Sequence, residues 1–168
     1  MAEMKEPVVL VDKDDNELGV QERDQAEQQQ SNVIRMVYLL FYDKNGRVLL
    51  QRRRPDLARY PNYWTVSATG AVRHGEGYVQ AGLRKAKDEL GVEPELSLAR
   101  KTIMPIPGRA SLMVALFTAP IEDAASIDPD SSRVQEVRWL TLEEARQGYL
   151  LTPTAEQVLA WIAKTWQK

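Results

Sequence analysis

The chain's most chemically suggestive residues lie between Gly70 and Val92. Glu76 stands near the start of this segment, and Lys85, Asp88 and Glu89 stand near its end. If the end of the segment is helical, these last three side chains share one side, because residues three and four apart are neighbours on a helix. Carboxylate oxygens are ligands for hard cations such as Mg²⁺, and a nearby ammonium competes with such a cation for the same oxygens. The segment therefore predicts either a metal site or a solvated helix face that carries an ion pair.

An amphipathic pattern predicts a helix from Gly77 to Leu90. The apolar residues Val79, Leu83, Ala86 and Leu90 recur every three or four positions, so we expect them to form its buried face. Gly91, just beyond the last of them, is typical of a helix C-terminus.

Short apolar runs on both sides of this helix predict strands. The first two, at 8–11 and 18–20, are separated by polar turn residues and indicate an N-terminal hairpin. Asn45-Gly46 is typical of a second hairpin turn. The remaining predicted strands are 34–42, 47–53, 64–68, 96–104, 111–121 and 134–140.

Helices are also expected near the C-terminus. A capping-box pattern opens one at Thr141, and another runs from Thr152-Pro153 to about Trp166, with Val158, Trp161 and Ile162 on the same face as Trp166. The polar stretch 21–31 predicts either a short helix or a surface loop. Strands with a central and a C-terminal helix indicate an α/β fold of the α+β type, with a mixed sheet packed between helices.

Composition narrows the classes of function. The 168 residues fit one domain, 1–168, and 43% of them are hydrophobic. A formal net charge of −2 gives no bulk attraction to a nucleic-acid polymer or a membrane surface. The absence of cysteine excludes disulfides, thiolate zinc sites and cysteine nucleophiles, and His74 is the single histidine. The chain shows neither a signal peptide nor a membrane-spanning run, so we expect a cytoplasmic protein.

The spacing of six residues in this segment resembles the Nudix box, the signature of hydrolases that cleave a diphosphate linked to another moiety. The residues on the pattern are Gly70, Glu76, Arg84, Glu89, Gly91 and Val92. Two positions depart from it: Asp88 replaces a glutamate, and Lys85 stands where the family has the glutamate of an Arg-Glu pair. Residues 70–92 therefore resemble a degenerate Nudix box.

The resemblance implies roles for these residues. Asp88 and Glu89 would bind Mg²⁺ or Mn²⁺, assisted by the backbone carbonyl of Thr69 or Gly70. Arg84 would orient the carboxylates by pairing with a glutamate such as Glu76. A lysine four residues before Glu89 is a potential ion-pair partner that would weaken metal binding.

Other segments are similar to isopentenyl diphosphate isomerases and to the Nudix hydrolases related to them. These segments are VVLVDKDDNELGVQER, VYLLFYDKNGRVLLQRR, RYPNYWTVSATGAV and VRWLTLEEA. The isomerase reaction uses a cysteine and a glutamate for proton transfer and a metal held mainly by histidines. Because this chain has no cysteine and one histidine, isomerisation is the least favoured of the functions considered.

The sequence thus predicts a metal-dependent Nudix hydrolase acting on a small diphosphate-containing molecule, with nucleoside diphosphate derivatives considered first. Its catalytic residues would be Glu89, Asp88, Arg84 and Glu76, and phosphate would be bound by Arg52, Arg53 and Lys85. The alternative is a module that keeps the fold and binds a phosphorylated ligand without turnover. Loops 54–63 and 105–110 are candidates for substrate selection, and a homodimer stays open.

Overall fold

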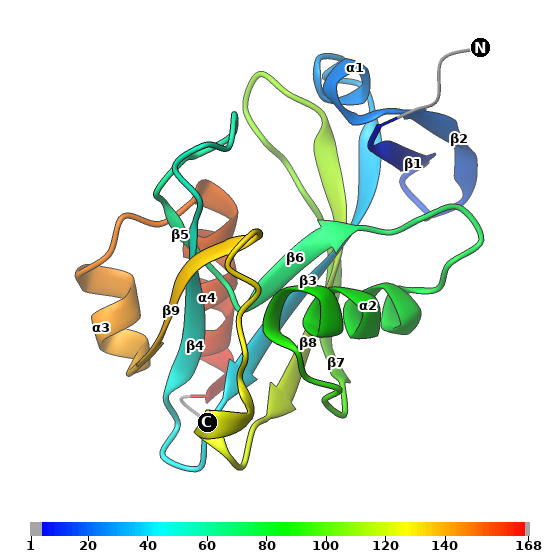
Figure 1. Ribbon diagram of the computed structural model, residues 1–168. Helices are drawn as coiled ribbons and strands as arrows, with labels where there is room; N and C mark the ends of the chain where they lie inside the picture. Colours follow the sequence, from blue (N-terminus) through cyan, green and yellow to red (C-terminus); the bar gives the residue numbers. More distant parts are fainter. Residues whose placement is uncertain (1–4, 167–168) are drawn as a thin grey trace.

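Residues 5–166 are described by a computed structural model, in which a mixed sheet lies between helices (Figure 1). The strands are β1 (Pro7–Val11), β2 (Glu17–Glu22), β3 (Val33–Tyr42), β4 (Val48–Arg53), β5 (Trp64–Thr65), β6 (Ala68–Ala71), β7 (Ser97–Met104), β8 (Ser111–Pro120) and β9 (Val134–Leu140). The helices are α1 (Arg23–Glu27), α2 (Tyr78–Leu90), α3 (Leu142–Gln147) and α4 (Pro153–Trp166), with a 3₁₀ turn at Ala124–Ser126. The fold class predicted from the sequence is confirmed.

The sheet consists of two parts that meet at one point. Strands β3 and β4 pair only at Tyr42 and Val48, next to their connecting turn, where Gly46 has φ +77°. Beyond this point β3 pairs with β6 and, in parallel, with β8, whereas β4 pairs with β5 and β9. The two parts therefore diverge, as Figure 1 shows for β3 and β4.

The chain crosses between the two parts at Val66 and Ser67. The sequence predicted one strand at 64–68, but β5 ends at Thr65 and β6 begins at Ala68, so this prediction was wrong. The crossing is fixed by the buried Ser67 hydroxyl, which accepts a hydrogen bond from the backbone N–H of Phe41 and donates one to the carbonyl of Leu49. It thus ties β3 to β4 where they have ceased to pair.

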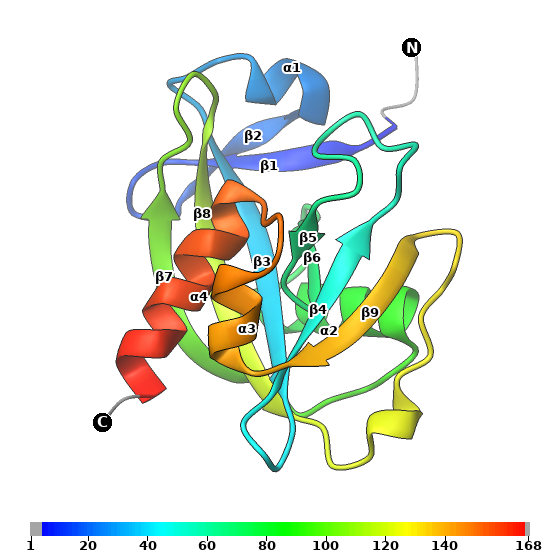
Figure 2. The ribbon, with the colours of Figure 1, turned by 90° about the vertical axis from the view of Figure 1, so that its left-hand side faces the viewer.

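Helices cover both faces of the sheet, with α2 on one face and α3 and α4 on the other (Figure 2). One apolar cluster joins Leu50, Val158 and Ile162 on the α4 side, and the other joins Leu49, Ala86 and Leu90 on the α2 side. Leu49 and Leu50 lie in different clusters because successive strand residues point to opposite faces. Within the described residues no helix is long and apolar enough to cross a membrane.

Helix α2 buries a narrower face than its apolar pattern predicts. Ala86 and Leu90 are fully buried, but Val79 and Leu83 are 48% and 37% exposed, so their assignment to the buried face was wrong. Gly82 faces the sheet instead, since a Cβ there would lie 3.2 Å from Leu39 Cδ2 and 3.5 Å from Val37 Cγ2 of β3. The helix ends as predicted at Gly91, which has φ +66°.

The predicted N-terminal hairpin is present as antiparallel β1 and β2. Its turn residue Asp15 has φ +65° and anchors the hairpin to three other elements. Arg35 of β3 and Tyr78 of α2 donate hydrogen bonds to the Asp15 carboxylate, and Lys101 of β7 pairs with it. This side chain thus connects the hairpin to the body of the molecule.

Candidate functional site

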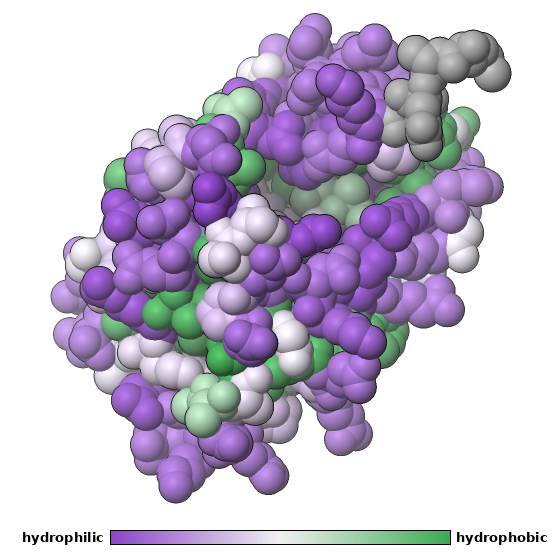
Figure 3. Space-filling model, in the orientation of Figure 1, coloured by the Kyte–Doolittle hydropathy of each residue, from purple (hydrophilic) through white to green (hydrophobic). Residues whose placement is uncertain are grey.

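A cavity of about 360 Å³ opens between the diverging strands. Gln51 of β4, Thr69 of β6 and Glu89 of α2 line one part of it. Loops 54–63 and 105–110, the candidates for substrate selection, also contribute residues to its wall. In Figure 3 the surface is hollowed beneath the N-terminal hairpin, with hydrophobic residues at the floor and hydrophilic residues around it.

The cavity's lining combines apolar and charged side chains. Its apolar part includes Met36, Tyr38, Leu57, Ile106 and Leu112. Within the described residues, seven basic and four acidic side chains also line it, so the cavity carries an excess of positive charge although the whole chain has a net charge of −2. A concave site with an apolar part and a cationic part suits an anion attached to a less polar group.

Glu89 is the most enclosed carboxylate of the cavity, with 8% of the residue exposed. Gln51 Nε2 donates a hydrogen bond of 2.8 Å to Glu89 Oε1, and Lys85 Nζ lies 2.8 Å from Glu89 Oε2. Gln51 also donates to the carbonyl of Ser67, so the segment that crosses between the two parts of the sheet positions the Gln51 side chain. The ion pair expected from the sequence is present, but it is not on a solvated helix face, because the side chains of Lys85 and Glu89 are only 15% and 10% exposed.

The aliphatic part of Lys85 passes directly over Gly70 of β6. A Cβ built at Gly70 would lie 2.6 Å from Lys85 Cδ and 2.7 Å from Lys85 Cε. A side chain at Gly70 would therefore require the end of the lysine side chain to move. The box glycine and the lysine that departs from the box fit each other.

Arg84, the residue before Lys85, points away from the cavity. Its Nε and Nη2 donate to the two carboxylate oxygens of Glu76 at 2.8 and 2.9 Å, and Nη2 also donates to the carbonyl of Ala71. Hydrogen bonding to Arg84 holds the pKa of Glu76 below its usual range. The predicted pair is present, and it ties the loop before α2 to the end of β6.

The cationic residue Arg53 lines the cavity. Among residues 5–166, no carboxylate forms an ion pair with it. Its Nε donates a hydrogen bond to the carbonyl of Arg59. Burial lowers the pKa of Arg53, and the neighbouring guanidinium groups of Arg59 and Arg23 lower it further. An anion bound next to Arg53 would relieve this repulsion.

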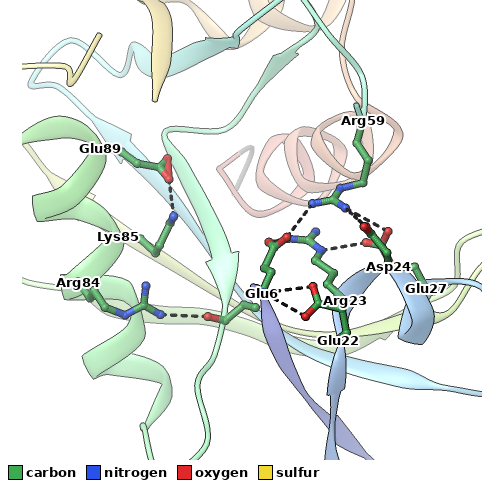
Figure 4. Close-up of polar contacts among 10 residues, drawn as sticks. Glu6, Glu22, Arg23, Asp24, Glu27, Arg59, Arg84, Lys85 and Glu89 are labelled. Atoms are coloured by element: carbon green, nitrogen blue, oxygen red, sulfur yellow. Dashed lines mark hydrogen bonds and ion pairs between the residues drawn. The ribbon is translucent and has the colours of Figure 1, made fainter. Parts of the chain in front are cut away.

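Arg23 and Arg59, in contrast, belong to a network of ion pairs at the rim (Figure 4). Arg23 contacts Glu6 and Glu27 at 2.8 and 3.0 Å. Arg59 lies 3.4–3.5 Å from Glu6, Asp24 and Glu27. These contacts hold loop 54–63 against α1 across the cavity.

The remaining predicted site residues are divided between the cavity and its surroundings. Thr69 lines the cavity with Lys85, Glu89 and Arg53, whereas the half-buried Asp88 does not. Arg52 does not line it either, and its guanidinium pairs with Glu136 at 3.2 Å. The catalytic role of Asp88 and the phosphate-binding role of Arg52 stay predictions.

The donor groups do not fit a metal held by the protein alone. Within the described residues, no group of three or more His, Cys, Asp or Glu side chains is arranged to hold a metal ion. Both oxygens of Glu89 have partners, one of which is an ammonium in the position where a cation would bind. Mg²⁺ or Mn²⁺ bound by Asp88, Glu89 and Thr69 therefore stays a prediction.

Gln51 is the site residue that sequence reasoning missed. The available signal was a glutamine two residues after Leu49 and two before Arg53 in a predicted strand. A polar side chain in a buried strand usually has a hydrogen-bond partner, so Gln51 indicated a contact with another polar group. Its partner Glu89 lies 38 positions away, and the sequence gives no indication of that contact.

Comparisons with known proteins place this geometry in a family. The family model of the NUDIX domain matches residues 33–162. An uncharacterized Nudix hydrolase of Pseudomonas aeruginosa is 33% identical over 147 residues, which are 84% of each chain. A prenyl-diphosphate phosphatase of Methanosarcina mazei is 29% identical over 85% of this chain and 84% of its own. An isopentenyl-diphosphate Delta-isomerase of Cutibacterium acnes is 28% identical over 79% of this chain and 72% of its own.

A solved structure supports the same assignment at the level of the fold. The crystal structure of a Deinococcus radiodurans protein superposes with a TM-score of 0.77 at 21% identity, covering 92% of this chain and 98% of that one. With the family model matching most of the chain, the chain belongs to the Nudix family, and isopentenyl-diphosphate Delta-isomerases are among the proteins it is similar to.

Proposed function

We propose that the chain is a hydrolase that cleaves the diphosphate linkage of a small molecule bound in the cavity. The observation that carries this proposal is the buried Glu89 carboxylate, positioned by Gln51 at the wall of a cationic cavity. Family membership supports hydrolysis, because relatives along most of the chain are named as a Nudix hydrolase and a prenyl-diphosphate phosphatase.

The cavity's residues suggest how the reaction would proceed. Arg53 and Lys85 would bind phosphate oxygens, since guanidinium and ammonium groups form strong hydrogen bonds to them. Glu89 would accept a proton from a water molecule that attacks phosphorus, while the bond to the bridging oxygen breaks. The proton then passes to the departing phosphate. Arg84 and Glu76 would act indirectly, by fixing the start of α2 relative to β6.

The group attached to the diphosphate would contact the apolar part of the cavity. Met36, Tyr38, Ile106 and Leu112 offer a surface for an aromatic base or a hydrocarbon chain rather than for a second strongly charged group. The proposed substrate class therefore includes nucleoside diphosphate derivatives and prenyl diphosphates. The isomerase reaction is not proposed: His74 is 70% exposed and pairs with Glu17 outside the cavity.

The test is phosphate or pyrophosphate release from a panel of nucleoside diphosphates, nucleotide sugars, dinucleotides and prenyl diphosphates. Each would be assayed with Mg²⁺, with Mn²⁺ and with EDTA, because the predicted metal requirement is a separate question. Turnover by the wild type that disappears in Glu89→Gln supports the proposal. Equal turnover by the two proteins would contradict it.

A second candidate is a module that binds a phosphorylated ligand without cleaving it. It is favoured by one observation, the pairing of Lys85 with the carboxylate that the hydrolase needs. Saturable binding of a panel member, with no turnover under any metal condition, would select this module.

A further inference from the structure

We propose that the ammonium of Lys85 is a built-in cation that binds diphosphate in the absence of any metal ion, and that Glu89 competes with the diphosphate for it. The inference rests on the proposed function in that it concerns the same cavity and the same ligand chemistry. It goes further by reversing the role of Glu89 in binding, from a metal ligand to a competitor of the anion.

The first support is the position of the charge. Lys85 Nζ lies 2.8 Å from Glu89 Oε2, and both residues line the cavity. A cation bound by Glu89 Oε2 would therefore compete with the ammonium for this oxygen and be repelled by its charge. No alternative cluster of three metal-binding side chains exists among residues 5–166.

The second support is that the surroundings are shaped for the lysine. Its aliphatic part fills the space above Gly70, where even one additional methyl group would overlap it at 2.6 Å. The side chain is 15% exposed, whereas that of Lys87 on the same helix is 70% exposed. Lys85 is thus directed into the cavity by its contacts rather than extending freely into solvent.

The third support is the demand for an anion. Arg53 lies in the same cavity without a carboxylate partner in the described part of the chain, and nearby guanidinium groups repel it. A diphosphate offers several charged oxygens, enough to contact Arg53 and to replace Glu89 as the partner of Lys85. When Lys85 moves to the phosphate, Glu89 keeps its hydrogen bond from Gln51 and becomes free to accept a proton.

The substitution Glu89→Gln should change diphosphate affinity in opposite directions for a lysine-based site and for a metal site. If Lys85 is the cation, removing the charge of Glu89 removes a competitor and strengthens diphosphate binding. If a metal held by Glu89 binds the diphosphate, the same substitution weakens binding. The direction of the change therefore separates the two.

The experiment is calorimetric titration of inorganic pyrophosphate into the full chain in buffer with EDTA. We expect saturable binding by the wild type, a loss of affinity of about tenfold or more in Lys85→Met, and a gain of roughly threefold or more in Glu89→Gln. Lys87→Met is the matched control, because it removes a lysine two positions away that does not line the cavity, and its affinity should equal that of the wild type.

Lys85→Met leaves the buried Glu89 carboxylate without its cationic partner, so this variant could unfold for that reason alone and a second variant is required. The double variant Lys85→Met/Glu89→Gln removes both charges and should fold while binding as weakly as Lys85→Met. Binding that requires added Mg²⁺ or Mn²⁺, no binding at all, or weaker binding by Glu89→Gln would each overturn the inference.

These titrations involve no turnover and so separate this inference from the hydrolase proposal. Metal-free binding with no hydrolysis of any panel member leaves the inference standing and removes the hydrolase. Hydrolysis by a protein that binds pyrophosphate only with metal does the opposite.

Discussion

Helix α2 carries two ion pairs that begin at adjacent residues, and they differ in every respect that matters for function. Arg84 binds both oxygens of Glu76 and a backbone carbonyl, outside the cavity. Lys85 makes one contact of 2.8 Å with Glu89, inside it. Neighbouring residues on a helix point in different directions, so one turn of α2 serves two purposes.

The chemistry of the two cations matches this division. A guanidinium is a rigid fork that holds a carboxylate in one geometry, as Arg84 does with Glu76. An ammonium is a point charge on a flexible stem that can exchange one oxygen partner for another. The Arg84–Glu76 pair is therefore expected to maintain the fold, and the Lys85–Glu89 pair to respond to a ligand.

The largest effect should come from Glu89, compared with Glu76. We expect Glu89→Gln to lower the hydrolysis rate by about 10²–10⁴-fold, the contribution of a general base. Glu76→Gln should change the rate far less, because Glu76 does not line the cavity. Steady-state rates on the best substrate of the panel would check this, and a similar loss in both variants would abolish the distinction between the pairs.

The next largest effect should be a loss of stability from the first pair. Arg84→Met removes three hydrogen bonds from a guanidinium and leaves the mostly buried carboxylate of Glu76 without its main partner. We expect the free energy of unfolding to fall by about 1.5–3 kcal/mol, measured by urea denaturation. Arg52→Met is the matched control, because the Arg52–Glu136 pair is more than a third exposed on both sides and is expected to contribute about 0–1 kcal/mol.

Arg52 and Arg53 provide a third contrast, within one strand. Arg53→Met should weaken pyrophosphate binding by about tenfold, because it removes a group that hydrogen-bonds to phosphate. Arg52→Met should leave the affinity nearly unchanged, because Arg52 does not line the cavity. Titration of both variants measures the difference, and an equal loss in both would restore the sequence-based prediction that both arginines bind phosphate.

The smallest effect concerns acid stability. Because Arg84 lowers the pKa of Glu76, this carboxylate stabilises the fold above its unfolded pKa of about 4.3, and the contribution is lost as the pH falls through its folded pKa. We therefore expect the difference in unfolding free energy between wild type and Glu76→Gln to be largest at pH 7 and to shrink below about pH 4.3. Urea denaturation from pH 7 to pH 3 would show it; a difference independent of pH would mean that the pair does not control Glu76.

Local patterns in the sequence were enough to predict much of this molecule. The N-terminal hairpin, the extent of α2 and its end at Gly91 follow from turn residues and helical periodicity, and all three are present. Two ion pairs of α2 were likewise expected, Lys85–Glu89 from its i, i+4 spacing and Arg84–Glu76 from the family resemblance. The extent of the domain, 1–168, the cytoplasmic location and the state of association stay predictions.

What the sequence did not reveal depends on tertiary geometry. Arg52 and Arg53 were assigned one role, but only Arg53 lines the cavity, because adjacent strand residues point to opposite faces. The contact between Gln51 and Glu89 arises because β3 and β4 diverge, and this divergence has no local signal. The exposure of Val79 and Leu83 also depends on tertiary packing, since the sheet contacts α2 along the narrow side that contains Gly82.

The most direct test of the account is a crystal structure of the full chain with pyrophosphate, grown in EDTA. We expect Lys85 Nζ to leave Glu89 Oε2 and to lie about 2.7–2.9 Å from a phosphate oxygen, with Glu89 still bonded to Gln51 and Arg84 still paired with Glu76. Pyrophosphate seated elsewhere in the cavity, with Lys85 still paired with Glu89, would contradict it.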